Sequence, residues 1–367
     1  MKTETDETCT LMRTIRYKRT LILNKNKIIV LVMFAICYVF FGCQRAHNKS
    51  EEWAFRKSFS EGLIPVKDYH GDWGYIDSKG KIIIPCQWGD ASSFSEGVAK
   101  VRDDNGNCGY INKKGEIILP CNWKDAGDFS EGMAAVCNHN NQWGFIDKNG
   151  DVVISYQWAM VNSFSEGMSL VIDEKDKIGF IDKTGKLIVP CKWSNAFSFH
   201  EGLAMVVDSN NKCGYIDKSG NVVIKCQWVL ANSFSEGLAT VGGKNGYWGY
   251  IDMKGNLVID YQWIYCYDFH DGLAVVKQNN AERWGYIDNK GNLIIPYKWK
   301  HASDFSEGLA VVLDKDNRYG YINLEGNLVV PCQYTSASSF IDGIAEVKEN
   351  DDIFFIDKNG NRIAEDE

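Results

Sequence analysis

Two sets of residues, nearly all of them carboxylates, recur along the chain at regular spacing, and carboxylates can bind calcium or act as an acid and a base in catalysis. One set opens a short turn: Asp77, Asn112, Asp147, Asp182, Asp217, Asp252, Asp288, Asn323 and Asp357. The other lies in Phe-Ser-Glu-Gly or a close variant: Glu61, Glu96, Glu131, Glu166, Glu201, Glu236, Asp271, Glu307 and Asp342. A calcium site needs several oxygens converging on one ion, and a glycosidase needs one matched pair in a cleft. Nine equivalent copies instead favour a structural role. The sequence therefore predicts no catalytic residue, no metal site and no cofactor.

The cysteines offer a second kind of chemistry, because secreted proteins can join cysteines in disulfides. Cys108 precedes Cys121 by the same spacing as Cys213 precedes Cys226. A hairpin brings the members of each pair close together across its turn. An oxidising compartment would then allow both bridges, and the alternative is that all four stay free thiols. No Cys-x-x-Cys pair and no Cys/His metal-binding spacing occurs in the sequence.

Cys43 is a candidate for covalent lipid attachment. Residues 1–27 are polar and basic, residues 28–41 are apolar without a charge, and Gly42 precedes Cys43. A basic region, a short apolar region and a small residue before a Cys are typical of a bacterial lipoprotein signal, in which the thiol is lipidated and becomes the new N-terminus. The two phenylalanines before Gly42 depart from the residues that this motif prefers.

Residues 1–43 have two other interpretations, an uncleaved membrane anchor and an ordinary cleaved signal. An apolar helix of about fifteen residues spans only about 22 Å, short of the roughly 30 Å hydrocarbon core, so the lipoprotein signal is favoured. We predict a signal or anchor at 1–43, a polar tether at 44–57 and one folded domain at 58–367. This places the protein in the bacterial cell envelope, anchored to a membrane through the lipid or the anchor, on an outer-membrane, periplasmic or surface face.

The folded part is acidic. The whole chain has a formal net charge of −8, although residues 1–43 are basic. Nucleic-acid binding needs a basic surface, so nucleic acid is excluded as the main partner. The chain is 45% hydrophobic and 13% aromatic, which is typical of a folded protein and excludes a disordered or fibrous one.

One motif recurs nine times along the chain, and the recurring carboxylates described above belong to it. The Gly of Trp-Gly-Tyr-Ile-Asp falls at Gly74, Gly109, Gly144, Gly179, Gly214, Gly249, Gly285 and Gly320. The Phe of Phe-Ser-Glu-Gly falls at Phe59, Phe94, Phe129, Phe164, Phe199, Phe234, Phe269, Phe305 and Phe340. A repeat of fixed period indicates a tandem array of one supersecondary unit. The ninth unit is cut short by the end of the chain.

Each unit is predicted to consist of short strands joined by tight turns. Residues 203–207 form one apolar run, and residues 213–216 and 221–224 flank an Asp-Lys-Ser-Gly turn that fits a hairpin. No useful stretch has the 3.6-residue apolar period of a helix, so the fold class is all-β. We predict nine hairpin units of about 35 residues in an open superhelical stack, with a closed β-propeller-like ring as the alternative. The repeated aromatic residues should form the core.

Units such as WGYIDNKGNLIIPYKW, with FSEGLAVV upstream, resemble the WG-repeat family of bacterial proteins. The resemblance covers residues 58–367. Departures are few: Cys108, Ile178, Cys213, Tyr319 and Ile353 replace the Trp, and Phe354 replaces the Gly. The resemblance implies a β-repeat architecture and an envelope or interaction role, and it implies no catalytic residue.

Positions that vary between units are where a partner would bind, because the framework positions build the array. The segment that follows the closing Trp is apolar in some units, as at residues 159–160, 229–230 and 264–265. Such residues either pack inward or form a binding patch. The candidate partner-binding residues are Ile264, Tyr265, Tyr267 and His301.

The predicted function is that of a non-enzymatic envelope lipoprotein whose repeat array serves as a binding scaffold. The expected partner is another envelope protein, or an envelope glycan. The alternative is a hydrolase or other enzyme built on a propeller-like repeat fold.

Overall fold

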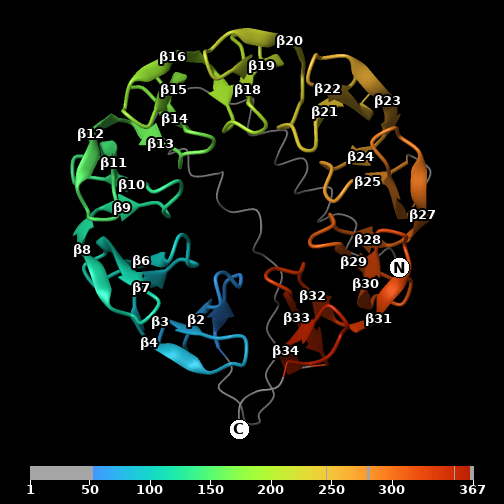
Figure 1. Cartoon of the computed structure of the whole chain (residues 1–367), viewed down its shortest axis with the longest axis horizontal. Coiled ribbons are helices and arrows are strands. Elements are labelled where there is room, and N and C mark those ends of the chain that lie inside the picture. The colour runs from blue at the N-terminus through green and yellow to red at the C-terminus, as the bar shows by residue number, and fades with distance from the viewer. Residues whose placement is uncertain (1–52, 245, 279–281, 351, 364–367) are drawn as a thin grey trace, which may run out of the picture. The chain divides into compact units, whose positions relative to one another are not determined.

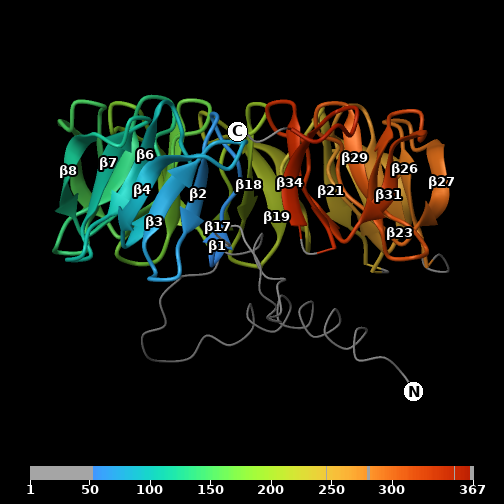
Figure 2. The same ribbon diagram turned by 90° about the horizontal axis from the view of Figure 1, so that it is seen from below.

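The computed structural model describes residues 53–244, 246–278, 282–350 and 352–363, and its secondary structure there is entirely β. Among these residues nine antiparallel sheets, seven of four strands and two of three, follow one another round a ring (Figure 1). We call each sheet a blade and number the blades 1 to 9 along the chain. Their strands run between the two faces of the ring (Figure 2), and the long last strand of blades 1 to 8 lies at the rim.

The strands of each blade are consecutive in the chain. Blades 1 to 3 comprise β1 (Phe55–Arg56), β2 (Ile64–Lys67), β3 (Trp73–Ile76) and β4 (Ile82–Trp88); β5 (Asp90–Ala91), β6 (Val98–Arg102), β7 (Cys108–Asn112) and β8 (Ile117–Trp123); and β9 (Asp125–Ala126), β10 (Ala134–Cys137), β11 (Trp143–Ile146) and β12 (Val152–Trp158). Blades 4 to 6 comprise β13 (Met160–Val161), β14 (Met168–Ile172), β15 (Ile178–Asp182) and β16 (Leu187–Trp193); β17 (Asn195–Ala196), β18 (Leu203–Val207), β19 (Cys213–Asp217) and β20 (Val222–Trp228); and β21 (Leu238–Gly242), β22 (Trp248–Asp252) and β23 (Leu257–Trp263). Blades 7 to 9 comprise β24 (Tyr265–Cys266), β25 (Ala274–Lys277), β26 (Trp284–Ile287) and β27 (Leu293–Trp299); β28 (His301–Ala302), β29 (Leu309–Leu313), β30 (Tyr319–Asn323) and β31 (Leu328–Tyr334); and β32 (Ser336–Ala337), β33 (Ile344–Glu349) and β34 (Asp352–Asp357).

Two tight turns in each blade explain why the carboxylates recur. In Asp77–Gly80 the Asp77 Oδ1 atom accepts the N–H groups of Lys79 and Lys81 at 2.9 and 3.0 Å, and Gly80 has a φ of +82°. The prediction that the Asp and Asn residues serve the turns is confirmed.

The Phe-Ser-Glu-Gly motif forms the other turn. Ser60 and Leu63 exchange two backbone hydrogen bonds, and Glu61 and Gly62 between them have φ values of 51° and 91°. This is the two-residue hairpin turn in which both central residues are left-handed. A glutamate in this conformation is disfavoured by about 1–2 kcal/mol. Its side chain is therefore expected to make a contact that offsets this cost.

The glycine that follows the Trp has no room for a side chain. A Cβ atom added to Gly74 would lie 2.5 Å from the carbonyl oxygen of Ile84, and one added to Gly285 would lie 2.6 Å from that of Ile295. The last strand crosses this position with a bulge in its register. This close approach of the last strand's backbone explains why the position needs glycine.

The hydrophobic core lies between successive blades. The Tyr75 ring contacts the Phe94 ring of the next blade at 5.0 Å between centroids, and its hydroxyl donates to the carbonyl oxygen of Ser92 at 2.8 Å. The equivalent rings of the later blades repeat this contact. Most of the repeated aromatic residues are buried, as the sequence predicts.

The ring is closed, so the favoured prediction of an open superhelical stack is wrong and the propeller-like alternative holds. Residues from opposite ends of the domain meet: the Phe59 and Phe355 rings lie 6.3 Å apart, and Arg56 lies 3.6 Å from Glu346. Ile64 packs in the same cluster as Phe355. Contacts between neighbouring units are predictable from a repeat, whereas the small rotation from one unit to the next decides between a helix and a ring.

One detail corrects a sequence-based boundary: strand β1 begins at Phe55, so the tether predicted at 44–57 ends too late. Among the described residues, β1 to β4 form blade 1 and β32 to β34 form blade 9. Within the described residues, none of the structure forms a helix of the length and apolar character needed to cross a bilayer.

Candidate functional site

Four rings meet at the boundary between blades 7 and 8. Trp284, at the start of β26, stacks on Tyr265 of β24 at 5.8 Å and on His301 of β28 at 6.2 Å. Tyr267 contacts the same indole at 5.6 Å. We call Tyr265, Tyr267, Trp284 and His301 the aromatic cluster. The structure thus brings together three of the four predicted partner-binding residues.

The cluster is open to solvent on one side. Tyr267 is 42% exposed and His301 is exposed, whereas Trp284, at 7%, forms the floor. Ile264, the fourth predicted residue, lies half-buried beside Tyr265, and its N–H donates to the Lys277 carbonyl oxygen.

The charge of this cluster comes from a lysine. The Lys277 ammonium group lies 5.5 Å from the Trp284 ring centre and 6.0 Å from that of Tyr265. Desolvation lowers the pKa of His301, against a smaller opposing effect of a hydrogen bond with the Ala302 backbone, and this direction favours the neutral imidazole. The cluster therefore offers apolar ring faces and one positive charge.

The same scaffold positions are filled differently at the boundary between blades 1 and 2. There Phe55 and Trp73 keep the ring contact at 5.7 Å, but Lys57 stands in the place of Tyr267 and Asp90 in the place of His301. The Lys57 Nζ atom donates to Asp90 Oδ1 at 2.9 Å and to the Ala91 carbonyl oxygen at 2.6 Å. A salt bridge occupies what is an aromatic surface at boundary 7/8.

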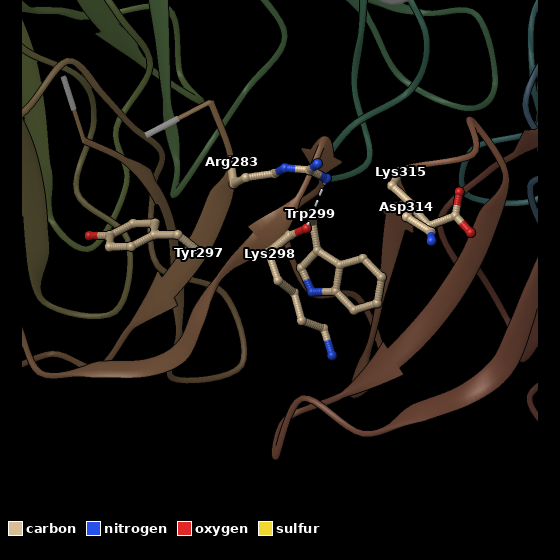
Figure 3. A pocket seen from close by; sticks show the side chains of 6 residues that line it. All are labelled: Arg283, Tyr297, Lys298, Trp299, Asp314 and Lys315. Carbon is tan, nitrogen blue, oxygen red and sulfur yellow. Dashed lines mark hydrogen bonds between the residues drawn. The ribbon is translucent and has the colours of Figure 1, made fainter. Parts of the chain in front are cut away.

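A hollow of about 410 Å³ is lined by residues of blades 7 and 8 (Figure 3). We call it the basic hollow. It is lined by Arg283, Tyr297, Lys298, Trp299, Asp314 and Lys315. Trp299, which lines the hollow, lies opposite Trp284 of the aromatic cluster in the pairing of β26 with β27, so the hollow adjoins the cluster. In Figure 3 the Arg283 side chain reaches toward the strand that carries Lys298, and its Nη1 atom donates to the Lys298 carbonyl oxygen at 3.2 Å.

Two buried carboxyl groups lie close to the aromatic cluster in the chain. Asp268 follows Tyr267, Asp304 is its equivalent in blade 8, and the Oδ1 atom of each is buried without a hydrogen-bond partner. Burial raises the pKa of Asp268 to about 6; Asp304 adds to this shift, and His270 and His200 oppose it. Burial also raises the pKa of Asp304.

The glutamates of the Phe-Ser-Glu-Gly turns join neighbouring blades. Glu131 of blade 3 accepts the N–H of Gly167 in blade 4 at 3.0 Å, and Lys183 of blade 4 lies 3.0 Å from the same carboxylate. We call this Lys–Glu pair a staple. Staples occur at Glu61–Lys113, Glu96–Lys148, Glu131–Lys183, Glu166–Lys218 and Glu307–Lys358. At boundaries 5/6, 6/7 and 7/8 the lysine position holds Met253, Asn289 or Leu324.

The four cysteines of the two possible disulfides are free thiols in this structure. The strand register explains this: Cys108 lies opposite Trp123, and Cys213 lies opposite Trp228, so that neither faces its predicted partner. Cys121 and Cys226 instead lie next to Gly109 and Gly214. Burial raises the pKa of Cys108 to about 11, which keeps that thiol protonated and poorly nucleophilic at neutral pH.

The position that Cys121 and Cys226 share has a role that the sequence did not reveal. Where it holds Tyr, the hydroxyl accepts the indole N–H of the closing Trp in the preceding blade, as Tyr261 does from Trp228 at 3.1 Å. Trp123 and Trp263 make the same bond to Tyr156 and Tyr297. Where the next blade has Cys, the indole nitrogen is buried without a partner: Trp88, Trp158, Trp193 and Trp299.

Cys43 lies outside the described residues, so its lipidation stays a prediction. In the part of the chain that the structure describes, no group of three or more His, Cys, Asp or Glu side chains is arranged to hold a metal ion.

Sequence reasoning missed Trp284 and the basic hollow. Trp284 conforms to the recurring Trp of the framework, and the loop that contains Asp314 and Lys315 is polar like the corresponding loops of other units. The signal lay in the departures from each column of the repeat: Lys298 stands where most units have Gln or Asn, and Arg283 directly precedes a Trp.

The chain matches a family model described as a WG containing repeat. The match occurs eight times, at residues 73–107, 109–141, 143–174, 178–213, 214–248, 248–280, 284–318 and 319–351. No curated protein is significantly similar to the chain in sequence.

Solved structures resemble the chain at low sequence identity. The computationally designed Ika8 protein is 11% identical over 73% of this chain and 95% of that one, with a TM-score of 0.44. BamB from Moraxella catarrhalis is 11% identical over 72% and 92% of the two chains, with a TM-score of 0.39. The WD40 beta propeller domain of Doa1 is 12% identical over 63% and 91%, with a TM-score of 0.31. These likenesses are too distant to inform the site.

Proposed function

This chain belongs to the WG containing repeat family, and from that premise we propose that it is a non-enzymatic binding scaffold of the bacterial cell envelope. The ring presents its partner with the aromatic cluster at boundary 7/8. The partner is an envelope protein or an envelope glycan.

The observation that carries this proposal is the exposure of rings at one boundary of a repeated scaffold. Exposed aromatic residues set over a buried, rigid floor are typical of residues that dominate a binding interface. Tyr267 supplies the exposed ring and Trp284 the floor. At boundary 1/2 the equivalent positions form the Lys57–Asp90 salt bridge, so the ring architecture itself does not require aromatic residues here.

The uses of the recurring carboxylates support a non-enzymatic role. Asp77 and its equivalents cap turns, and Glu131 and its equivalents bind a neighbouring blade. A carboxylate held in this way is fixed by the framework. These recurring carboxylates therefore do not supply the acid and base that the alternative function, a hydrolase, would need.

The binding experiment replaces three cluster residues by asparagine, which other blades carry at the same positions. The variant is the full chain with Tyr265→Asn, Tyr267→Asn and His301→Asn. Asn195 is the equivalent of Tyr265 and His301, and Asn162 is the equivalent of Tyr267. Wild type and the triple variant, each bound to beads, are incubated with solubilised envelope, and the captured species are compared. We expect species that wild type retains and the triple variant loses.

The control is Val229→Ser, since Val229 is 55% exposed and belongs to the linker between blades 5 and 6. This variant should capture the same species as wild type. Equal capture by all three proteins, with unchanged circular dichroism, would contradict a site at boundary 7/8.

Membrane attachment through Cys43 is the second part of the proposal. Cys43→Ser should block processing and leave a larger species that retains residues 1–42, because the lipidated thiol is needed for cleavage. Acyl chains contribute about 0.8 kcal/mol per buried CH₂ to membrane binding, and a palmitate analogue should label wild type but not the variant. Unlabelled wild type that retains residues 1–42 would show an uncleaved anchor instead.

A further inference from the structure

The basic hollow differs in charge from the rest of this acidic protein. It is lined by three cationic side chains, Arg283, Lys298 and Lys315, and by one carboxylate, Asp314. The Asp314 Oδ1 atom accepts the turn N–H groups of Asp316 and Arg318 at 2.8 and 2.9 Å. This carboxylate is therefore fixed in its own turn, as its equivalents are in other blades.

The cations are specific to this boundary when it is compared with boundary 1/2. In the places of Arg283, Lys298 and Lys315, boundary 1/2 carries Asp72, Gln87 and Asp104. The Asp314 equivalent there is Asp103, which caps its turn in the same way. At these three positions the scaffold therefore holds three cations at boundary 7/8, and two carboxylates and one amide at boundary 1/2.

One wall of the hollow combines these charges with a ring face. The Lys298 ammonium group lies 4.5 Å from the centre of the Trp299 ring, whereas the Tyr297 ring points away from the other lining side chains (Figure 3) and its hydroxyl accepts the Trp263 indole N–H. The Arg283 guanidinium group has five N–H donors and gives one to the Lys298 carbonyl oxygen. A guanidinium fork matches the paired oxygens of a carboxylate or a phosphate.

We propose that the basic hollow binds the anionic group of an acidic saccharide, a sugar that carries a carboxylate or a phosphate, while the adjoining aromatic cluster packs against the sugar rings. This inference rests on the proposed binding function and names the ligand class of the same boundary. Arg283 and Lys298 hold the anion, and Lys315 lies across the hollow on the turn between β29 and β30. Ring faces beside a cation suit a saccharide, because its C–H groups pack on aromatic rings while its acidic substituent meets the charge.

The test measures binding to the full chain in detergent by titration calorimetry. The probes are trigalacturonate, which carries carboxylates, glucose 6-phosphate, neutral maltotriose and inorganic phosphate. We expect one or both acidic saccharides to bind, with an affinity that falls as the salt concentration is raised from 20 to 200 mM, because salt screens the charges. Maltotriose should bind at least tenfold more weakly.

The matched variants remove equal charge at two boundaries. Arg283→Asp with Lys298→Gln installs the residues of boundary 1/2 and should weaken binding of the acidic probe at least tenfold. Lys177→Asp with Lys192→Gln makes the same change of net charge at boundary 4/5, where the Lys192 ammonium group also lies over a Trp ring, at 4.9 Å. This control should change the affinity less than twofold.

Three results would overturn the inference: no binding of either acidic saccharide at millimolar concentration, equal weakening by both double variants, or inorganic phosphate binding as tightly as glucose 6-phosphate. These results are distinguishable from a failure of the proposed function. Loss of envelope capture in the Tyr265, Tyr267 and His301 variant would still establish a binding site at boundary 7/8, and only its ligand class would be wrong.

Discussion

Boundaries 1/2 and 7/8 are built on the same framework but differ in the residues at their variable positions. Both have the tight glycine beside the Trp, at Gly74 and Gly285, and both have a tyrosine hydroxyl bonded to the next blade. At boundary 1/2 the variable positions hold the blades together, through the Lys57–Asp90 salt bridge and the Glu61–Lys113 staple. At boundary 7/8 they hold rings and cations that face solvent.

The difference teaches that contacts between blades and contacts with a partner draw on the same few positions. Blade 7 carries Tyr267 at the position of Lys57, so it has no lysine there to form a salt bridge with blade 8. Leu324 stands at the position of the staple lysine, so the staple is missing at Asp271. Blades 6 and 7 are flanked by boundaries that lack the staple. The surface proposed to bind a ligand therefore lies where the ring has fewer ion pairs, while the hydrophobic core continues through it.

The largest expected effect tests whether the framework is the same at both boundaries. Gly74→Ala and Gly285→Ala would each place a Cβ atom about 2.5 Å from a carbonyl oxygen, which forces the last strand of the blade to move. Overpacking of this kind costs about 3 kcal/mol or more. Urea unfolding followed by tryptophan fluorescence should show a similar loss for both variants, and a tolerated alanine at either position would separate the two frameworks.

The buried carboxyl group of Asp268, in blade 7, should make the free energy of unfolding depend on pH. Because the pKa of Asp268 is raised from 3.8 to about 6, its stabilising contribution is complete below pH 3.8 and is lost as the pH rises through 6. Asp268→Ser, which installs the residue found at Ser93, should therefore stabilise the protein by about 2 kcal/mol at pH 7.5 and by less at pH 5. Urea titrations at the two pH values check this, and an equal effect at both would refute it.

Much of the fold and part of the site could be predicted from sequence. The turns, the close-approach glycine and the aromatic core follow from local rules, because residues such as Asp77 and Gly74 act within one blade. Closure of the ring and the Glu131–Lys183 staple depend on how blades are rotated against one another, which a repeat does not encode locally. Tyr265, Tyr267 and His301 were found as departures from the repeat, whereas Trp284 was hidden because it conforms to it.

The two boundaries share one defect, and its repair should have the same effect on both. Trp88 and Trp299 each bury an indole N–H without a partner, because Cys121 and Cys332 stand where other blades have Tyr. Cys121→Tyr and Cys332→Tyr supply the acceptor and should each stabilise the protein by about 1 kcal/mol in urea unfolding.

The reciprocal control for this repair is Tyr261→Phe, which removes the acceptor of Trp228 while keeping the ring. It should destabilise the protein by about 1 kcal/mol or more, since a buried donor is left unpaired. No change in Tyr261→Phe would mean that the indole bond contributes nothing, and the two repairs would then gain nothing either.

The smallest expected effect concerns the staples that distinguish the two regions. Lys183→Met removes one staple, and Met253→Lys, at a residue that is 39% exposed, offers a lysine to Glu201 at boundary 5/6. Exposed ion pairs contribute only about 0.2–1 kcal/mol, so the first change should destabilise and the second stabilise by that amount.

Although burial opposes it, the hydrogen bond from Lys183 helps to lower the pKa of Glu131 below 4.5. The contribution of this staple is therefore present above that value and is lost as the pH falls through the lowered pKa. A double-mutant cycle with Glu131→Gln at pH 7 and at pH 3 isolates the pair, and a coupling energy that persists at pH 3 would assign the effect to lysine packing instead of charge.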